Sequence, residues 1–192
     1  MVGAITYKVS SAAPAAVPDM ANAGGQSPDN PSANGSGGQS VPVRAPDISS
    51  LTPRERFDRL FNRIMQAAER QDSQQVQSFT PMALGAYQQL DTIDIDARYH
   101  AAVLHMGVGD YAPAYALADT ILQESPGHLF GYIIRGTAAD LQGDASAASR
   151  ARRDFLAHYD REMSAKRVEY QEHRPVVEEF RAKAENVNGK HE

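Results

Sequence analysis

Cysteine and tryptophan are both absent from the 192 residues of this chain. Without cysteine, the chain has no disulfide bond, no thiolate metal site and no cysteine nucleophile. This absence leaves the compartment open, because cysteine-free proteins occur in oxidising and in reducing surroundings. The Gly-x-Ser-x-Gly elbow of serine hydrolases and a complete phosphate-binding glycine loop are lacking too. We therefore predict a protein that is not an enzyme, with no catalytic residues and no cofactor.

An excess of one charge sign and long apolar runs are also missing. The net charge is −5 with no block of like charges, which argues against nucleic acid as a partner. The apolar start, Met1–Val9, is far shorter than the roughly 20 residues that a spanning helix needs. It also lacks the basic first region of a signal peptide.

The first residues nevertheless suggest a membrane connection. A short apolar stub and a lysine precede a stretch rich in serine, alanine, proline and glycine, an arrangement typical of the segment that follows a membrane anchor. One hypothesis is that such an anchor lies upstream, as in a bacterial membrane-complex accessory protein. The chain as given indicates a cytoplasmic protein, whereas an upstream anchor would indicate a periplasmic or membrane-tethered one.

Residues 1–50 are expected to form a tether without a core of their own. They hold six of the 11 prolines and six of the 14 glycines, and Tyr7 is their only aromatic residue. Such a segment cannot bury enough apolar surface to offset the entropy lost on ordering. The sequence therefore predicts a disordered tether over 1–50 and a folded domain over 51–192.

A dipeptide recurs with a fixed period in the second half of the chain. Gly109-Asp110 returns 34 residues later as Gly143-Asp144, and alanines follow at the same offset, at Ala114 and Ala148. A period of 34 residues is typical of repeats built from two helices joined by a turn. The recurrence therefore predicts an all-α protein.

Two repeat units follow from this period, over residues 95–128 and 129–162. In the first unit Gly109 breaks one helix, and Asp110 is expected to cap the next by accepting a hydrogen bond from an unpaired amide. A turn over 125–127, which contains proline and glycine, ends the second helix.

The residues at the matching positions of both units resemble those of the tetratricopeptide repeat (TPR) family. The resemblance is carried by Ala102, Gly109, Asp110, Tyr111, Ala114, Ala118 and Pro126, and then by Tyr132, Gly136, Gly143, Asp144 and Ala148. It implies a short helix–turn–helix solenoid of TPR type. Asp160 stands where the family has its closing proline, so the last helix of the second unit is expected to run on.

Weaker patterns flank the two units. A degenerate hairpin is predicted over 51–94, since Thr52, a proline and Glu55 form the start signal known as a capping box. Pro81 is expected to interrupt or begin a helix there. A C-terminal helix over 173–186 is predicted to cap the solenoid, because a terminal unit must cover an apolar face on one side and meet water on the other.

The histidines and acidic residues do not fit a known ligand spacing. His100 and His105 are five residues apart, which does not place them together on one helical face, so no metal site is predicted. His128 follows a glycine in a turn and is expected to be solvated. The three aspartates in 91–96 are out of register with a calcium-binding loop and are interpreted as an acidic helix start.

The TPR resemblance also implies a concave groove that binds peptides. The residues that correspond to this groove are Phe61, Met65, Tyr99, Val103, Met106, Phe130, Ile133 and Thr137. Two interpretations stay open, because the same apolar side chains could line a partner site or simply form core.

The sequence favours a noncatalytic protein–protein interaction module or scaffold that binds a peptide or helix of a partner protein. One alternative is a structural subunit of a larger assembly. Another is a small-ligand binder or enzyme with a site between the hairpins and the C-terminal helix, where Tyr99, His100 and Asp140 would have to converge. A membrane would be contacted only through the hypothetical upstream anchor.

Overall fold

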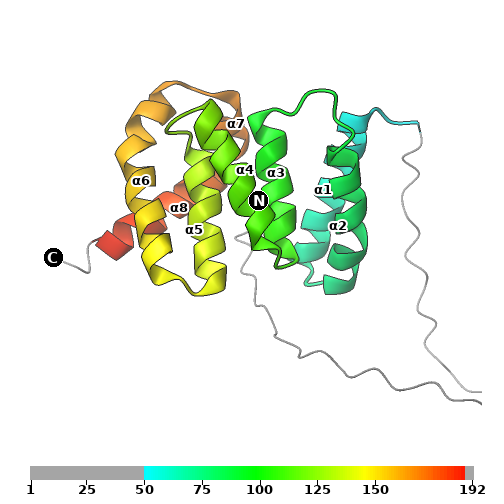
Figure 1. The fold of residues 1–192 in the computed structure, drawn as a ribbon, viewed down its shortest axis with the longest axis horizontal. Coiled ribbons are helices and arrows are strands. Elements are labelled where there is room, and N and C mark those ends of the chain that lie inside the picture. The colour runs from blue at the N-terminus through cyan, green and yellow to red at the C-terminus, as the bar shows by residue number, and fades with distance from the viewer. Residues whose placement is uncertain (1–49, 189–192) are drawn as a thin grey trace, which may run out of the picture. The chain divides into compact units, whose positions relative to one another are not determined.

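The computed structural model describes residues 50–188, and the regular structure in this range is entirely α-helical (Figure 1). The predicted tether and the proposed anchor junction lie outside the described residues. The helices are α1 (Pro53–Glu69), α2 (Ser73–Tyr87), α3 (Ile95–Gly107), α4 (Tyr111–Glu124), α5 (Leu129–Gln142), α6 (Ala145–Ser164), α7 (Val168–Glu172) and α8 (Arg174–Asn188). The all-α prediction is confirmed for this part of the chain.

The first six helices pack in chain order, each against the next. The closest pairs are α1 with α2, α3 with α4, and α5 with α6, while α2–α3 and α4–α5 contacts join one pair to the following one. Helix α8 packs on α6 and reaches α5, and it runs behind both in the view of Figure 1. Three successive helical pairs are thus followed by one helix that lies across the last pair.

All three pairs share one turn geometry. The backbone is left-handed at the last turn residue, with φ of +58° at Gln71, +79° at Gly109 and +75° at Gly143. The next amide then donates to the carbonyl five residues earlier, at 2.9 Å each time: Asp72 to Ala67, Asp110 to His105, and Asp144 to Ala139. This bond closes the helix end in the manner of a Schellman motif. The first pair therefore makes the same turn as the two predicted units, with glutamine in place of glycine.

The aspartate that follows each turn caps the second helix in only two of the three pairs. Asp72 and Asp144 accept from the amides three residues later, at Gln75 and Ala147. Asp110 makes no such bond, so its predicted capping role is wrong. The amide three residues after Asp110 would belong to Pro113, which has no N–H to donate.

Helix α2 passes straight through Pro81, so the predicted interruption at this residue is wrong. Pro81 is exposed, whereas the residues that surround it in the helix bury a continuous face formed by Val76, Phe79, Thr80, Ala83 and Ala86. Burial of this face against the rest of the protein offsets the missing backbone hydrogen bond, which is how tertiary packing overrides local propensity.

In the described part of the chain, three helices follow Asp144. Helix α6 runs for 20 residues, longer than α4 or α5 with 14 each, as expected from the missing proline. A helix predicted over 173–186 is present as α8. The short helix α7, which lies between them, was not expected.

Helix α7 explains why His128 is buried rather than solvated, contrary to the prediction. Tyr170 of α7 accepts a hydrogen bond from the amide of Leu129 at 2.9 Å, and Glu169 lies 3.2 Å from Nε2 of His128. The Nδ1 atom of His128 accepts from the amide of Phe130, which caps α5. The segment that covers this ring lies some 40 residues away in sequence, so the turn around His128 did not reveal it.

The apolar core consists of two clusters that meet at α3. One cluster is centred on α1 and α2, the other on α4, α5, α6 and the C-terminal helices, and Val103 and Leu117 pack against both. Where α8 crosses α5 there is no room for a side chain at Gly136, because an added Cβ would lie 2.5 Å from Cζ of Phe180. A glycine at this position therefore allows the close approach of α8.

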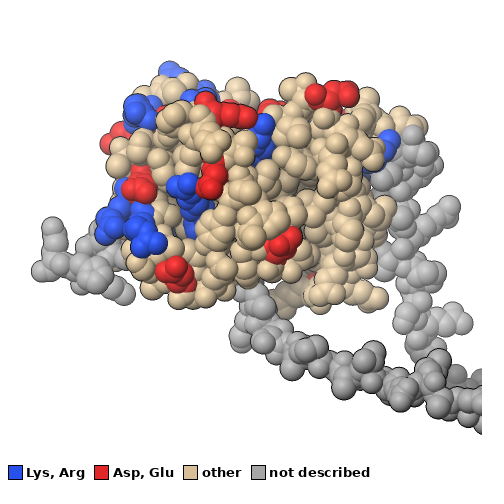
Figure 2. All heavy atoms as spheres, in the orientation of Figure 1, with Lys and Arg blue, Asp and Glu red and all other residues tan. Residues whose placement is uncertain are grey.

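The surface of the described residues carries both charge signs. In the view of Figure 2, acidic and basic side chains gather over α5 and α6, and fewer lie over α1–α4. On this face no extended patch of one sign is visible. Among the described helices, none is both long enough and apolar enough to cross a membrane.

Candidate binding groove

A cavity of about 500 Å³ lies between the first helices of the three pairs and the C-terminal helices. Helices α1, α3 and α5 form one wall, and the segment from the end of α7 into α8 forms the other. Seven of the eight residues predicted for the groove line this cavity: Phe61, Met65, Tyr99, Val103, Met106, Ile133 and Thr137. We call this cavity the groove.

The eighth predicted residue, Phe130, does not reach the groove. Its side chain is fully buried and stacks on Tyr99 with ring centroids 4.3 Å apart. Tyr170 and His173 meet the Phe130 ring edge-on. Because α7 and the start of α8 cover this end of α5, Phe130 belongs to the core.

The groove combines an apolar floor with an acidic rim. Half-buried Met65, Val103 and Thr137 contribute to its lining. Exposed carboxylates come from both walls, with Glu69 at the end of α1 and with Glu172 and Glu179 on the opposite side; Lys183 is the one lysine among the lining residues.

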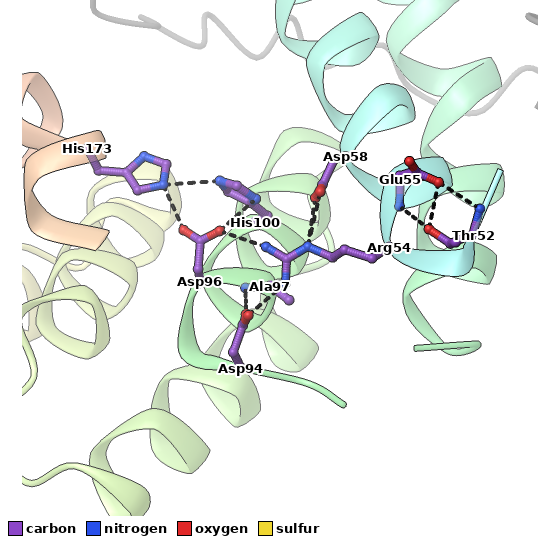
Figure 3. Close-up of polar contacts among 9 residues, drawn as sticks. All are labelled: Thr52, Arg54, Glu55, Asp58, Asp94, Asp96, Ala97, His100 and His173. Carbon is purple, nitrogen blue, oxygen red and sulfur yellow. Dashed lines mark hydrogen bonds and ion pairs between the residues drawn. The ribbon is translucent and has the colours of Figure 1, made fainter. Parts of the chain in front are cut away.

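A polar cluster occupies one end of the groove, where α3 meets the junction of α7 and α8. Its members are Asp96 and His100, one helical turn apart on α3, and His173 (Figure 3). Nε2 of His173 lies 2.8 Å from Oδ1 of Asp96 and 3.2 Å from Nε2 of His100. We call these three residues the Asp–His cluster.

The surroundings of the Asp–His cluster set the charge of two of its members. Burial alone would raise the pKa of Asp96, but the hydrogen bond from His173 and the neighbouring positive charges outweigh this effect and lower it. Burial is the main cause that lowers the pKa of His100 to about 4. At neutral pH the cluster therefore contains a carboxylate beside a neutral His100 imidazole.

Arg54 ties the cluster to the first helix. Its guanidinium lies 3.2 Å from Oδ2 of Asp96 and 2.7 Å from Asp94, and it also bonds Asp58 on α1 (Figure 3). Asp94 in turn accepts from the amide of Ala97 and caps α3. The aspartates interpreted from the sequence as an acidic helix start thus include a cap and one member of the cluster.

The structure does not bring Tyr99, His100 and Asp140 together, as the small-ligand or enzyme alternative required. Tyr99 and His100 line the groove, but Asp140 forms an ion pair with Arg152 of α6 instead, at 2.5 Å. The partners of His100 that sequence reasoning missed are Asp96 and His173. The i, i+4 spacing of Asp96 and His100 was a usable signal, whereas His173 is 73 residues away from His100.

Comparisons with protein-family models, with curated proteins and with solved structures found no match to this chain.

Proposed function

We propose that this protein is a noncatalytic interaction module, and that its groove binds an apolar peptide segment that carries basic residues. The observation that carries the proposal is the cavity of about 500 Å³ that remains after α8 has packed. A face that served only as core would be filled by the helix that covers it, because protein interiors are close-packed.

A TPR-type arrangement is part of this proposal. It is supported by the three identical turn bonds at Asp72, Asp110 and Asp144 and by the successive packing of three helical pairs. It is further supported by the groove itself, which is formed by the first helix of each pair, as the resemblance implies.

The chemistry of the groove indicates the chemistry of the partner. Methionine, valine and isoleucine side chains along its floor suit apolar anchors, which supply most of the affinity when a peptide enters a hydrophobic groove. The carboxylates of Glu69, Glu172 and Glu179 on its rim favour lysine or arginine next to those anchors, since complementary charges speed encounter and reject wrong partners.

A peptide-display selection on the purified full-length protein tests the proposal. Selected sequences are expected to combine apolar anchors with lysine or arginine. Thr137→Arg places a long cation inside the groove and should weaken binding of a selected peptide by roughly tenfold or more, the size of a hot-spot effect.

The matched control is Thr120→Arg. Thr120 is also half-buried, but it lies on α4 and does not line the groove. This variant should bind the peptide as the unchanged protein does. Recovery of no peptide, or equal binding by both arginine variants, would refute the proposed groove function.

A further inference from the structure

The Asp–His cluster brings three metal-ligand atoms together from two parts of the chain. One carboxylate oxygen of Asp96 and one ring nitrogen each of His100 and His173 all lie within 4.8 Å of one another. Two histidines and one carboxylate, with further positions left open, are a ligand set used by zinc and by non-haem iron.

One spacing in the cluster is close to that of a tetrahedral site. Zinc–nitrogen bonds of about 2.05 Å place two ligands of one tetrahedron roughly 3.3 Å apart. The two Nε2 atoms of His100 and His173 are 3.2 Å apart. The 2.8 Å separation between His173 and Asp96 would have to widen by about half an ångström to meet the same geometry.

Hydrogen bonds alone leave the cluster poorly satisfied. A neutral His173 has at most one hydrogen on Nε2, yet both Oδ1 of Asp96 and Nε2 of His100 face that atom. Nδ1 of His100 is buried without a hydrogen-bond partner, at 3.7 Å from Oδ2 of Asp96. One hydrogen on Nε2 of His173 cannot serve both of its neighbours, and an unserved polar group away from water is costly, so a cation suits the Nε2 side of the cluster; Nδ1 of His100 would not be served by it.

We propose that Asp96, His100 and His173 bind a divalent transition cation of the zinc class. The cation would accept the lone pairs of both Nε2 atoms and of Oδ1, and it would replace the hydrogen bond between His173 and Asp96. All three side chains line the groove, so the fourth coordination position faces it and is available to water or to a donor atom of a bound partner.

The neighbours of the cluster suit this role. Arg54 bonds Oδ2 of Asp96 and leaves Oδ1 for the cation, in the way that outer hydrogen bonds orient ligating carboxylates. The bound cation would link α3 to the junction of α7 and α8, and so fix the two walls of the groove at one end. This inference does not depend on the proposed peptide function, since the cation site can be measured without a peptide.

Isothermal titration of the untagged full-length protein with Zn²⁺, after removal of metals by a chelator, tests the site. One Zn²⁺ per chain is expected to bind. His173→Ala and Asp96→Asn should each weaken this binding at least tenfold. Asp96→Asn keeps the size of the side chain, so that a loss of affinity is not explained by repacking. With Co²⁺ as the probe, the visible absorption bands of tetrahedral coordination should appear and should be lost in both variants.

His105→Ala is the matched control. His105 lies on the same helix with a similar exposed fraction, 19% against 12% for His100, and pairs with Asp110 outside the cluster. Its Zn²⁺ affinity should equal that of the unchanged protein. Absence of binding by the unchanged protein, or equal affinity in all three variants, would overturn the proposal.

Discussion

The three aspartates at the hairpin turns show how one neighbouring residue decides what an identical side chain can do. Asp144 caps α6 because Ala147 offers its amide at 2.9 Å. Asp110 has the same place in its turn, but Pro113 has no N–H to donate. The carboxylate of Asp110 contacts His105 at 3.1 Å instead. Sequence reasoning recognised the aspartates but did not combine them with this proline.

We therefore predict different costs for the two alanine substitutions. Asp144→Ala removes a capping bond and should lower the free energy of unfolding by about 1 kcal/mol. Asp110→Ala removes an exposed contact and should cost no more than about 0.5 kcal/mol. Urea denaturation of both variants measures the difference, and an equal loss in both would contradict the assigned caps.

His128 makes the stability of the fold dependent on pH. Burial is the main cause that lowers its pKa, and the hydrogen bond with Glu169 only partly opposes this. Glu162 and Arg167 are the other charged groups that act on the ring. In the unfolded chain the histidine returns to its ordinary pKa of about 6.5.

Because the unfolded chain takes up the proton first, His128 contributes stability above about pH 6.5 and loses it as the pH falls towards its folded pKa. The free energy of unfolding should thus decrease between pH 7 and pH 5. His128→Asn keeps an acceptor that can cap α5 but does not titrate, so its decrease should be smaller. Urea denaturation at several pH values tests this, and equal slopes for both proteins would contradict it.

At the scale of helices, the crossing of α5 and α8 depends on one small residue. Glycine in the middle of a helix usually lowers stability by about 0.5–1 kcal/mol relative to alanine. At position 136 we expect the opposite order, with alanine less stable than glycine. An added Cβ there would lie 2.5 Å from Cζ and 2.8 Å from Cε2 of Phe180.

Gly136→Ala is expected to destabilise the protein by roughly 1–3 kcal/mol, the usual cost of overpacking. A second substitution, Phe180→Leu, makes room and should show favourable coupling in a double-mutant cycle. Gly85→Ala on α2 is the matched control, because nothing lies within 4 Å of its added Cβ; this variant should be more stable than the unchanged protein. Stabilisation by Gly136→Ala as well would contradict the described crossing.

The helices that sequence reasoning located best were those with repeated local signals. The 34-residue recurrence placed the turns at Gly109 and Gly143, and the capping box at Thr52 placed the start of α1. The prediction at Pro81 was wrong because the sequence did not reveal that this residue is exposed on a helix whose opposite face is buried. Helix α7 was missed because five residues hold too little periodic pattern, although Tyr170 is almost fully buried.

At the scale of the whole molecule, the groove was easier to predict than the cluster at its end. Its residues on α1, α3 and α5 were carried over by position from the TPR resemblance once the turns were known. The Asp–His cluster needs His173, whose position depends on how α7 and α8 return to α3. Phe130 was misplaced for the same reason, since the returning segment covers it.

The groove is also what the proposed function and the proposed metal site have in common. Its long walls would receive the partner, and the Asp–His cluster would fix the distance between α3 and the start of α8 at one end. We propose that this one cavity, rather than another surface, receives the partner.

Methyl NMR with labelled methionine tests this claim most directly, because some methionines of the described residues line the groove and others do not. Met65 and Met106 line the groove, whereas Met82 on α2 and Met163 on α6 do not. When a display-selected peptide is added to the full-length protein, the Met65 and Met106 signals should shift and those of Met82 and Met163 should not. Shifts of Met82 or Met163, with Met65 and Met106 unmoved, would contradict the account.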